Sequence, residues 1–387
     1  MKKIFAIVLS LCLVTGIVTG CSAGSQKEKS GTTTDVETIT PESTAAENKA
    51  EANVIVDHLG ITVTLPKNIQ RVAIVELLPL PSVYAVYQNG NVENLVAMPP
   101  DSLNAAKNSI LSMYAPDILN VSTDCLEGGE LNMEELLKLS PDVVFYSGAK
   151  YTELFEQAGI TAVGFSATAG GTNTIETLGK WIELLESVFQ EESKVTGIIE
   201  YGREAENEID KRLATLTEEE RVRALTINQY TDSALMAAGK GTFGEYWSEA
   251  TGSINVALAA EKNTINMEQV YEWNPEKIFM STLTSFMPKD IFENTAAPGH
   301  DWSTVAAVQD KEVYKFPLGM HRWWPPSSDA PLSLWWIAKT TYPELFEDID
   351  MKQMTKEYYE KFYGMTLSDE DLEWIFNPRE NLGRNAS

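Results

Sequence analysis

The feature that most constrains the fold is a short phrase that occurs twice in the chain. The first copy is LNMEELLKLSPDVVFY at residues 131–146, and the second is INMEQVYEWNPEKIFM at residues 265–280. Asn, Met, Glu, Pro and Phe recur at the same offsets. In each copy an amphipathic stretch is followed by Pro and a short apolar run, which predicts a helix, a turn and a strand. A chain that carries this unit twice is expected to form two related α/β halves.

The segments around the first copy predict a parallel sheet. In residues 54–65, β-branched residues flank His58-Leu59-Gly60 and Gly60 supplies the turn, which is typical of a β-hairpin. Residues 71–78 are a short apolar strand, and residues 173–190 are an amphipathic helix. Short apolar strands that alternate with helices favour a parallel sheet covered on both faces.

The second half repeats this order after a long helical segment. Residues 191–216 run without Pro and carry mixed charges, which predicts a solvated spine helix. Further strands are expected at 221–230, 276–282 and 312–318, and helices are expected around 331–342 and 351–363. Open α/β sheets bind ligands at the carboxyl ends of their strands. Two such edges that face each other across a spine would form a cleft, which is the shape of a receptor.

The beginning of the chain predicts export and anchoring. Residues 1–20 combine two lysines with an apolar run, as a secretory signal does. The run ends in Val-Thr-Gly before Cys21, which resembles a bacterial lipobox and predicts lipidation of Cys21. The alternative is a plain signal peptide with an incidental Cys. Residues 21–53 are polar and are expected to form a flexible tether. The predicted division is then 54–190 for the N-terminal lobe, 191–216 for the spine and 217–387 for the C-terminal lobe.

Charge and cysteine content limit the possible partners. The net charge is −26, and removal of Lys2 and Lys3 with the signal takes it to −28. Such an acidic surface repels nucleic acid and anionic membrane, so membrane contact is expected only through the lipid anchor. After loss of Cys12 and lipidation of Cys21, Cys125 is the remaining cysteine. We therefore expect no intrachain disulfide, and we expect Cys125 to be a buried small hydrophobe.

Sequence signatures of enzymes are not found. The chain has no G-x-S-x-G elbow and no H-E-x-x-H helix. The GKGT at 239–242 lacks the preceding Gly of a phosphate loop, since Ala234 occupies that position. The protein is predicted not to be an enzyme.

Several motifs in the same order resemble class III solute-binding lipoproteins of ABC importers, which capture iron–siderophore complexes, haem and cobalamin. The motifs are Asp57, Gly60 and Val63 with Arg71-Val72, the repeated Asn132–Asp142 and Asn266–Glu276, and the stretches 239–252 and 325–344. The resemblance implies two lobes with central parallel sheets joined by one long spine helix. It also implies a monomeric, extracytoplasmic receptor without a cofactor, whose partner is the permease dimer of an ABC importer.

The resemblance also gives the repeated glutamates a role. In this family a glutamate on each lobe meets arginines of the permease, and Glu134 and Glu268 are the matching positions. The alternative is that both acids only stabilise helix N-termini through the helix dipole.

The ligand site is expected at the ends of the predicted strands. The candidates are Leu78, Pro79, Ser147, Lys150, Tyr230, Thr242, Phe243, Thr282, His321, Arg322, Trp323 and Trp324. Pro325-Pro326 forces an extended backbone after the last four of these residues. We expect one of Trp323 and Trp324 to line the cleft and the other to be structural. Arg322 either anchors anionic oxygens or forms a solvated salt bridge.

The small number of histidines bears on the ligand class. The whole chain has three histidines, and a receptor for a bare transition-metal ion usually needs several together with carboxylates. His321 alone is a weak sign of metal ligation, so no metal site built from side chains is predicted. A chelated metal needs shape, aromatic faces and a few polar anchors. The sequence therefore favours an iron–siderophore complex, with haem or cobalamin as alternatives and an oligosaccharide stacked on the tryptophans as a further one.

Overall fold

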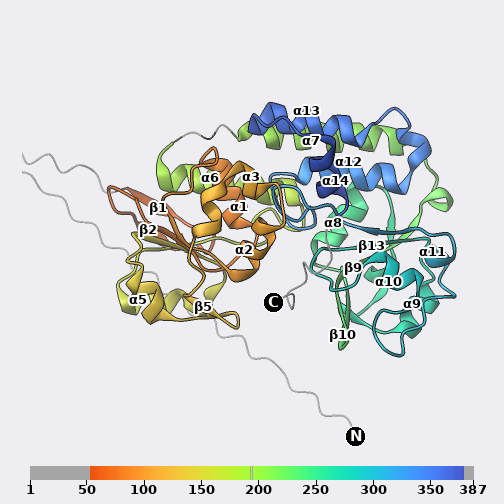
Figure 1. Cartoon of the computed structure of the whole chain (residues 1–387), viewed down its shortest axis with the longest axis horizontal. Helices are drawn as coiled ribbons and strands as arrows, with labels where there is room; N and C mark the ends of the chain where they lie inside the picture. The colour runs from red at the N-terminus through yellow and green to blue at the C-terminus, as the bar shows by residue number, and fades with distance from the viewer. Residues whose placement is uncertain (1–52, 192, 194, 379–387) are drawn as a thin grey trace, which may run out of the picture. The chain divides into compact units, whose positions relative to one another are not determined.

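The computed structural model describes residues 53–191, 193 and 195–378 (Figure 1). The predicted signal segment, Cys21 and the tether up to residue 52 lie outside the described residues. No described helix is both long and apolar enough to cross a lipid bilayer.

The first sheet lies in the N-terminal lobe and is parallel. Its order is β4-β3-β7-β8, and each neighbouring pair runs in the same direction. All four residues of β7 are buried, as expected for a strand covered on both faces. The strands are β3 (Val72–Ile74), β4 (Leu95–Ala97), β7 (Val143–Tyr146) and β8 (Ala162–Gly164), with a short pair β5 (Leu126–Glu127) and β6 (Glu130–Leu131) outside the sheet. The helices are α1 (Leu80–Tyr87), α2 (Pro100–Lys107), α3 (Leu111–Tyr114), α4 (Met133–Lys138), α5 (Thr152–Ala158) and α6 (Thr174–Phe189).

The hairpin at the beginning of the lobe is attached by its aspartate. Strands β1 (Val54–Val56) and β2 (Thr62–Thr64) pair antiparallel, as the sequence predicted. Asp57 accepts hydrogen bonds from the backbone N–H of Leu59 and of Ile61 within the turn, and its second oxygen accepts one from Gly164 at 2.8 Å. One carboxylate therefore closes the turn and holds it against the end of β8.

The second sheet is mixed rather than purely parallel. In the order β12-β10-β9-β13-β14, the pairs of β13 with β9 and β14 are parallel, whereas β10 is antiparallel to β9 and β12. The antiparallel edge was not predicted. It arises because the polar pair Asp232-Ser233 turns β9 directly back into β10. The strands are β9 (Arg223–Thr231), β10 (Ala234–Ala237), β11 (Ile254–Asn255), β12 (Thr264–Ile265), β13 (Lys277–Met280) and β14 (Val313–Lys315).

The repeated phrase folds into the same unit in both lobes. Asn132 caps α4 and Asn266 caps α9 (Met267–Trp273), and each side-chain oxygen accepts backbone N–H groups of the first turn. At the other end Ser140 and Asn274 have positive φ angles of 46° and 39°, directly before the repeated Pro. A left-handed residue followed by Pro ends a helix abruptly. The chain then enters β7 in one lobe and β13 in the other.

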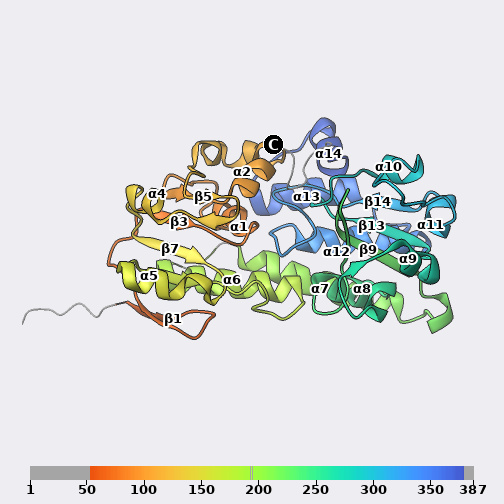
Figure 2. The same cartoon turned by 90° about the horizontal axis from the view of Figure 1, so that it is seen from below.

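The spine helix α7 (Thr196–Leu213) connects the two lobes. It packs on α6, α8 (Phe243–Ala250) and α12 (Ala330–Thr341), and Figure 2 shows α6 and α7 following one another from the first sheet towards α8. One continuous apolar core extends from the first sheet under α7 to α12. The remaining helices are α9, α10 (Pro288–Phe292), α11 (Ala306–Gln309), α13 (Met351–Tyr363) and α14 (Asp369–Phe376).

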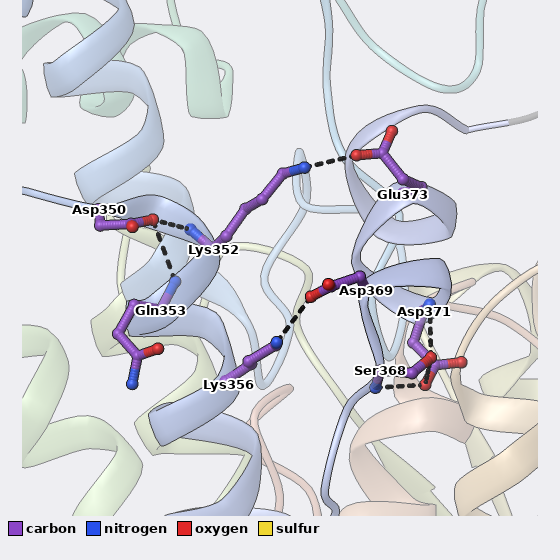
Figure 3. Close-up of polar contacts among 8 residues, drawn as sticks. All are labelled: Asp350, Lys352, Gln353, Lys356, Ser368, Asp369, Asp371 and Glu373. Atoms are coloured by element: carbon purple, nitrogen blue, oxygen red, sulfur yellow. Dashed lines mark hydrogen bonds and ion pairs between the residues drawn. The ribbon is translucent and has the colours of Figure 1, made fainter.

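Helix α14 was not predicted from the sequence, although its signal is present. The Ser368 hydroxyl accepts a hydrogen bond from the backbone N–H of Asp371, and the Asp371 carboxylate accepts from Ser368, which is a capping box. Figure 3 shows this cap beside two ion pairs between α13 and α14, Lys352 with Glu373 and Lys356 with Asp369. These contacts hold α14 against α13.

Candidate functional site

A cavity of about 260 Å³ opens where the two lobes meet. Its N-terminal side comes from the residues that follow β3 and β8 and from α6. Its C-terminal side comes from the first residue of α8, the residues after β13 and the loop between β14 and α12. The lining residues are Leu77, Leu78, Pro79, Ala167, Trp181, Phe243, Leu283, His321, Arg322, Pro325 and Pro326. The cavity thus lies at the carboxyl ends of the parallel strands, where α/β folds bind ligands.

Arg322 supplies a fixed positive charge to this cavity. Its side chain is 1% exposed although the guanidinium stays protonated at any physiological pH. No Asp or Glu occurs among the described residues that line the cavity. A guanidinium at the wall of a cavity can donate hydrogen bonds to anionic oxygens, so Arg322 suits the site to a negatively charged ligand.

His321 supplies a neutral polar group beside this charge. The residue is 1% exposed, and its Nε2 has no hydrogen-bond partner among the described residues. Desolvation, with a smaller contribution from the Arg322 charge, holds the pKa of His321 well below its usual 6.5. At neutral pH the imidazole is therefore uncharged, and Nε2 can either donate a hydrogen bond or bind a metal, depending on the tautomer.

A third basic side chain, Lys315, lies behind the cavity wall. Its Nζ donates hydrogen bonds to the carbonyl oxygens of Thr284 at 2.9 Å and Phe286 at 2.7 Å, in the loop that also carries Leu283. Burial lowers the pKa of Lys315 from 10.5 to about 7; the nearby Asp290 raises it, and the Arg322 charge adds to the lowering. The region around the cavity is basic in a protein whose net charge is −26.

The rest of the cavity wall is apolar. Leu77, Leu78, Phe243 and Leu283 present half-buried hydrophobic surface, and Trp181 is 1% exposed. The Trp181 indole N–H donates a 2.7 Å hydrogen bond to the carbonyl of Ser166, which fixes the ring beside Ala167. A few polar anchors in an apolar wall are typical of small-molecule sites.

Five of the twelve predicted ligand residues line this cavity. They are Leu78, Pro79, Phe243, His321 and Arg322. The solvated salt bridge considered for Arg322 does not fit its burial.

The other polar candidates do not line the cavity. The Ser147 backbone N–H donates to Glu76, and the exposed Lys150 pairs with Glu130. Thr242 caps α8, with its hydroxyl accepting from the N–H of Gly244. Tyr230 and Thr282 are fully buried in the C-terminal lobe, and the Tyr230 hydroxyl is 2.7 Å from His300 Nδ1. Position at a strand end was therefore not enough to predict which side chains line the cavity.

The expectation for the two tryptophans is corrected by the structure. Trp323 is fully buried and Trp324 is 3% exposed, and neither lines the cavity. The Trp323 indole N–H donates to Asp329, and the Trp324 ring packs edge-to-face on Phe316. Both rings turn into the core because the loop is packed between α12, α13 and α14. Trp335 is buried, and Trp336 is half-buried and does not line the cavity.

Sequence reasoning missed Trp181, Leu283 and the buried acid Asp329. Trp181 sits on the apolar face of a predicted helix, where a core role and a cavity role have the same pattern. Asp329 lies in the stretch 325–344 but contacts α13, and no local sequence pattern predicts such a distant contact.

A side-chain metal centre is not found among the described residues, where no group of three or more His, Cys, Asp or Glu could hold an ion. Cys125 is fully buried as predicted, and burial raises the pKa of its thiol to about 11.

The two repeated glutamates are exposed and outside the cavity. Each is the second residue of its helix, α4 or α9. Glu134 is 82% exposed at its side chain and lies 3.1 Å from Lys138 one turn later.

The sequence profile of the periplasmic binding protein family matches residues 85–318, which is more than half of the chain. This chain belongs to that family. The molybdate-binding protein MolA of Haemophilus influenzae is 26% identical over 331 residues, covering 80% of this chain and 90% of that protein. The family consists of solute receptors of ABC importers, so the protein is an extracytoplasmic receptor and not an enzyme.

Solved structures show the same fold. A periplasmic solute-binding protein of Veillonella parvula has a TM-score of 0.72 and 28% identity, covering 84% of this chain and 96% of that one. MolA with bound molybdate has a TM-score of 0.67 and 24% identity, covering 81% and 99%. The haem-binding protein HmuT has a TM-score of 0.57 and 18% identity, covering 80% of this chain and 96% of that one. The last two likenesses concern the fold alone.

Proposed function

We propose that the protein captures a compact, negatively charged metal complex in the inter-lobe cavity and delivers it to an ABC importer permease. The observation that carries this proposal is the adjacency of the buried Arg322 and His321 in a cavity without a lining carboxylate. The planar guanidinium suits paired oxygens of a chelating group.

An anionic ferric siderophore is the ligand that this chemistry favours. Its catecholate or carboxylate oxygens would face Arg322. The neutral Nε2 of His321 would donate a hydrogen bond to such an oxygen or occupy an open position on the metal. The leucine, proline and phenylalanine side chains would cover the apolar edges of the chelator.

The volume of the cavity favours a compact ligand. The volume of about 260 Å³ lies just below the range of about 300–1,000 Å³ that holds drug-sized ligands. A large ferric siderophore would need a wider opening between the lobes, as haem and cobalamin would, so the volume favours the smaller chelates of the proposed class. Oligosaccharide binding loses its support because the two tryptophans assigned to stacking are buried in the core.

A metal oxyanion is the second candidate. It is favoured by the small cavity, by Arg322 and by the similarity to a protein described as molybdate-binding. A tetrahedral oxyanion would use Arg322 and His321 as donors and would leave most of the apolar wall without contact. The wall is the feature that makes the chelate the first choice.

Fluorescence titration of the full-length protein tests the proposal, since Trp181 lines the cavity. The probes are a ferric tris-catecholate, a neutral ferric tris-hydroxamate, sodium molybdate and sodium sulfate. We expect the anionic catecholate to bind at least about tenfold more tightly than the neutral complex, a difference of about 1.4 kcal/mol. Arg322→Gln should abolish this preference, and Arg203→Gln, at an exposed arginine of α7, should preserve it.

Two results would redirect the proposal. Saturable molybdate binding without chelate binding would assign the second candidate. Equal affinity of wild type and Arg322→Gln for every anionic probe would move the ligand away from this cavity.

The docking and anchoring expectations complete the proposal. Glu134 and Glu268, one per repeat, would each meet a basic pocket of the permease dimer, supported by their exposure and by their equivalent places in α4 and α9. The receptor would act as a monomer held at the membrane by lipidated Cys21. Support for the anchor comes from the sequence at residues 18–21.

A further inference from the structure

Asp329 is a buried carboxylate that accepts four hydrogen bonds. The residue is fully buried. Its Oδ2 accepts from the backbone N–H of Met320 at 2.6 Å, from the Trp323 indole at 3.1 Å and from the Tyr359 hydroxyl at 2.9 Å. Its Oδ1 accepts from the Tyr363 hydroxyl at 2.8 Å. Burial raises the pKa of this carboxyl, and the donors oppose that effect.

The donors come from two separate parts of the chain. Met320 and Trp323 flank His321 and Arg322 in the loop between β14 and α12, whereas Tyr359 and Tyr363 are on α13. One carboxylate therefore holds the backbone on both sides of the two polar ligand-site residues. It also connects that backbone to a helix that does not line the cavity.

The loop is built closely around this carboxylate. A Cβ on Gly319 would lie 2.1 Å from Asp329 Oδ2, so glycine is required at that position. The Gly319 carbonyl accepts from the N–H of Ile110 in the N-terminal lobe at 3.1 Å. Leu318 donates to the carbonyl of Ile375 in α14 at 2.9 Å. The ion pairs in Figure 3 hold α14 against α13. The helix that contacts Leu318 and the helix that contacts Asp329 are therefore attached to each other.

We propose that Asp329 is a positioning residue of the ligand site, which fixes His321 and Arg322 at the cavity by holding Met320 and Trp323 against Tyr359 and Tyr363. An apolar residue would fill the same volume without the cost of a buried charge, and it would give the loop no directional bonds. Partners behind a binding residue typically change affinity by about 10- to 100-fold when they are removed. The proposal rests on the proposed function, because that function assigns the ligand to His321 and Arg322.

The experiment compares Asp329→Ala with Asp329→Asn in the full-length protein. Asn keeps one acceptor oxygen for the three donors that bind Oδ2. Its NH₂ group can donate to the Tyr363 hydroxyl, which then accepts a hydrogen bond instead of donating one. We expect Asp329→Ala to weaken binding of the ferric tris-catecholate, or of molybdate if that is the wild-type ligand, by about 10- to 100-fold. The affinity of Asp329→Asn should remain within about threefold of the wild-type value, a difference of less than about 0.7 kcal/mol.

Two further measurements separate positioning from general stability. Val270→Ala removes buried volume from α9, remote from the loop, and should lower stability without changing affinity. Amide hydrogen exchange needs no ligand: residues 318–328 should lose protection in Asp329→Ala, while residues 225–230 keep theirs.

The outcomes distinguish this proposal from the proposed function. If no probe binds wild type but the loop loses protection in Asp329→Ala, the ligand assignment fails and the positioning role stands. If Arg322→Gln loses affinity while Asp329→Ala binds and exchanges like wild type, the positioning role is wrong. Equal loss of affinity in Val270→Ala would also overturn it, because instability alone would then explain the effect.

Discussion

Arg71 and Asp142 bind each other through both backbone and side chain. The Asp142 N–H donates to the Arg71 carbonyl at 2.8 Å, and the Asp142 carboxylate accepts from the Arg71 N–H at 2.9 Å. The Arg71 guanidinium also donates twice to the carbonyl of Leu139, at the end of α4.

The second lobe repeats this arrangement. The Glu276 N–H donates to the Arg223 carbonyl at 2.8 Å, its carboxylate accepts from the Arg223 N–H at 2.8 Å, and the Arg223 guanidinium donates to the carbonyl of Trp273. The repeated acid after Pro therefore closes the helix–turn–strand unit onto the first strand of the sheet in its own lobe. Each lobe is clamped at the equivalent place.

This clamp predicts matched losses of stability in the two lobes. Asp142→Ala and Glu276→Ala should each lower the free energy of unfolding by about 1–3 kcal/mol, because backbone N–H groups lose their acceptor. Urea unfolding followed by circular dichroism measures both. Glu153→Gln, at an exposed acid of α5, serves as the control and should stay within about 0.5 kcal/mol of wild type. Losses no larger than the control would show that water replaces the clamp without cost.

Trp181 should be the reporter of ligand binding. Its ring lines the cavity, whereas Trp336 lines a surface groove on the C-terminal lobe. We expect Trp181→Phe to remove most of the ligand-induced change in fluorescence and Trp336→Phe to preserve it. By contrast, Trp324→Ala should cost about 3–5 kcal/mol of stability, since it empties core volume. A full fluorescence response in Trp181→Phe would contradict the placement of the ligand.

Lys315 should make stability depend on pH in a defined window. Its folded pKa is about 7 against 10.5 for an exposed lysine, so between these values the unfolded chain carries a proton that the folded protein lacks. The free energy of unfolding then rises with pH across this window, and the gain is lost as pH falls towards 7. Relative to Lys315→Met, wild type should gain at most about 1.4 kcal/mol per pH unit. Urea unfolding at several pH values tests the slope, and equal slopes for wild type and Lys315→Met would contradict the prediction.

The repeated glutamates should act on transport and not on binding. The double variant Glu134→Lys with Glu268→Lys should keep its ligand affinity and lose uptake in cells, because charges at the rim of an interface govern encounter and register. The matched control reverses two exposed acids outside the repeats, Glu93→Lys with Glu293→Lys, and should still support uptake. Full uptake by the first double variant would leave both acids as helix caps.

Lipidation should depend on Cys21. In the native host, Cys21→Ala should leave the signal segment attached or release the protein from the membrane. Cell fractionation combined with mass spectrometry of the N-terminus shows which occurs. A variant that is processed normally and stays on the membrane would refute the lipobox assignment.

The sequence by itself determined the repeated helix–turn–strand unit and the hairpin at the beginning of the first lobe. The repeated phrase predicted two α/β units, and β7, β13, α4 and α9 lie within it as expected. The hairpin around Gly60 was also predicted correctly. These features depend on near neighbours along the chain: side-chain periodicity, a capping Asn, and a Pro after a left-handed residue. Local interactions of this kind can be predicted from the amino-acid sequence alone.

Only the tertiary structure decided which side chains reach the ligand cavity. The strand-end rule pointed to the loop of His321 and Arg322, which lines the cavity, but it could not tell that Trp323 and Trp324 turn into the core. That orientation is set by α13 and α14, which contact the loop through Asp329 and Ile375. Packing against distant segments decides which side chains of a loop point into the core, because its aromatic rings are buried at the places where those segments leave space. For the same reason the roles of Trp181 and Lys315 could not be predicted from the sequence, because they depend on contacts that form only in the folded chain.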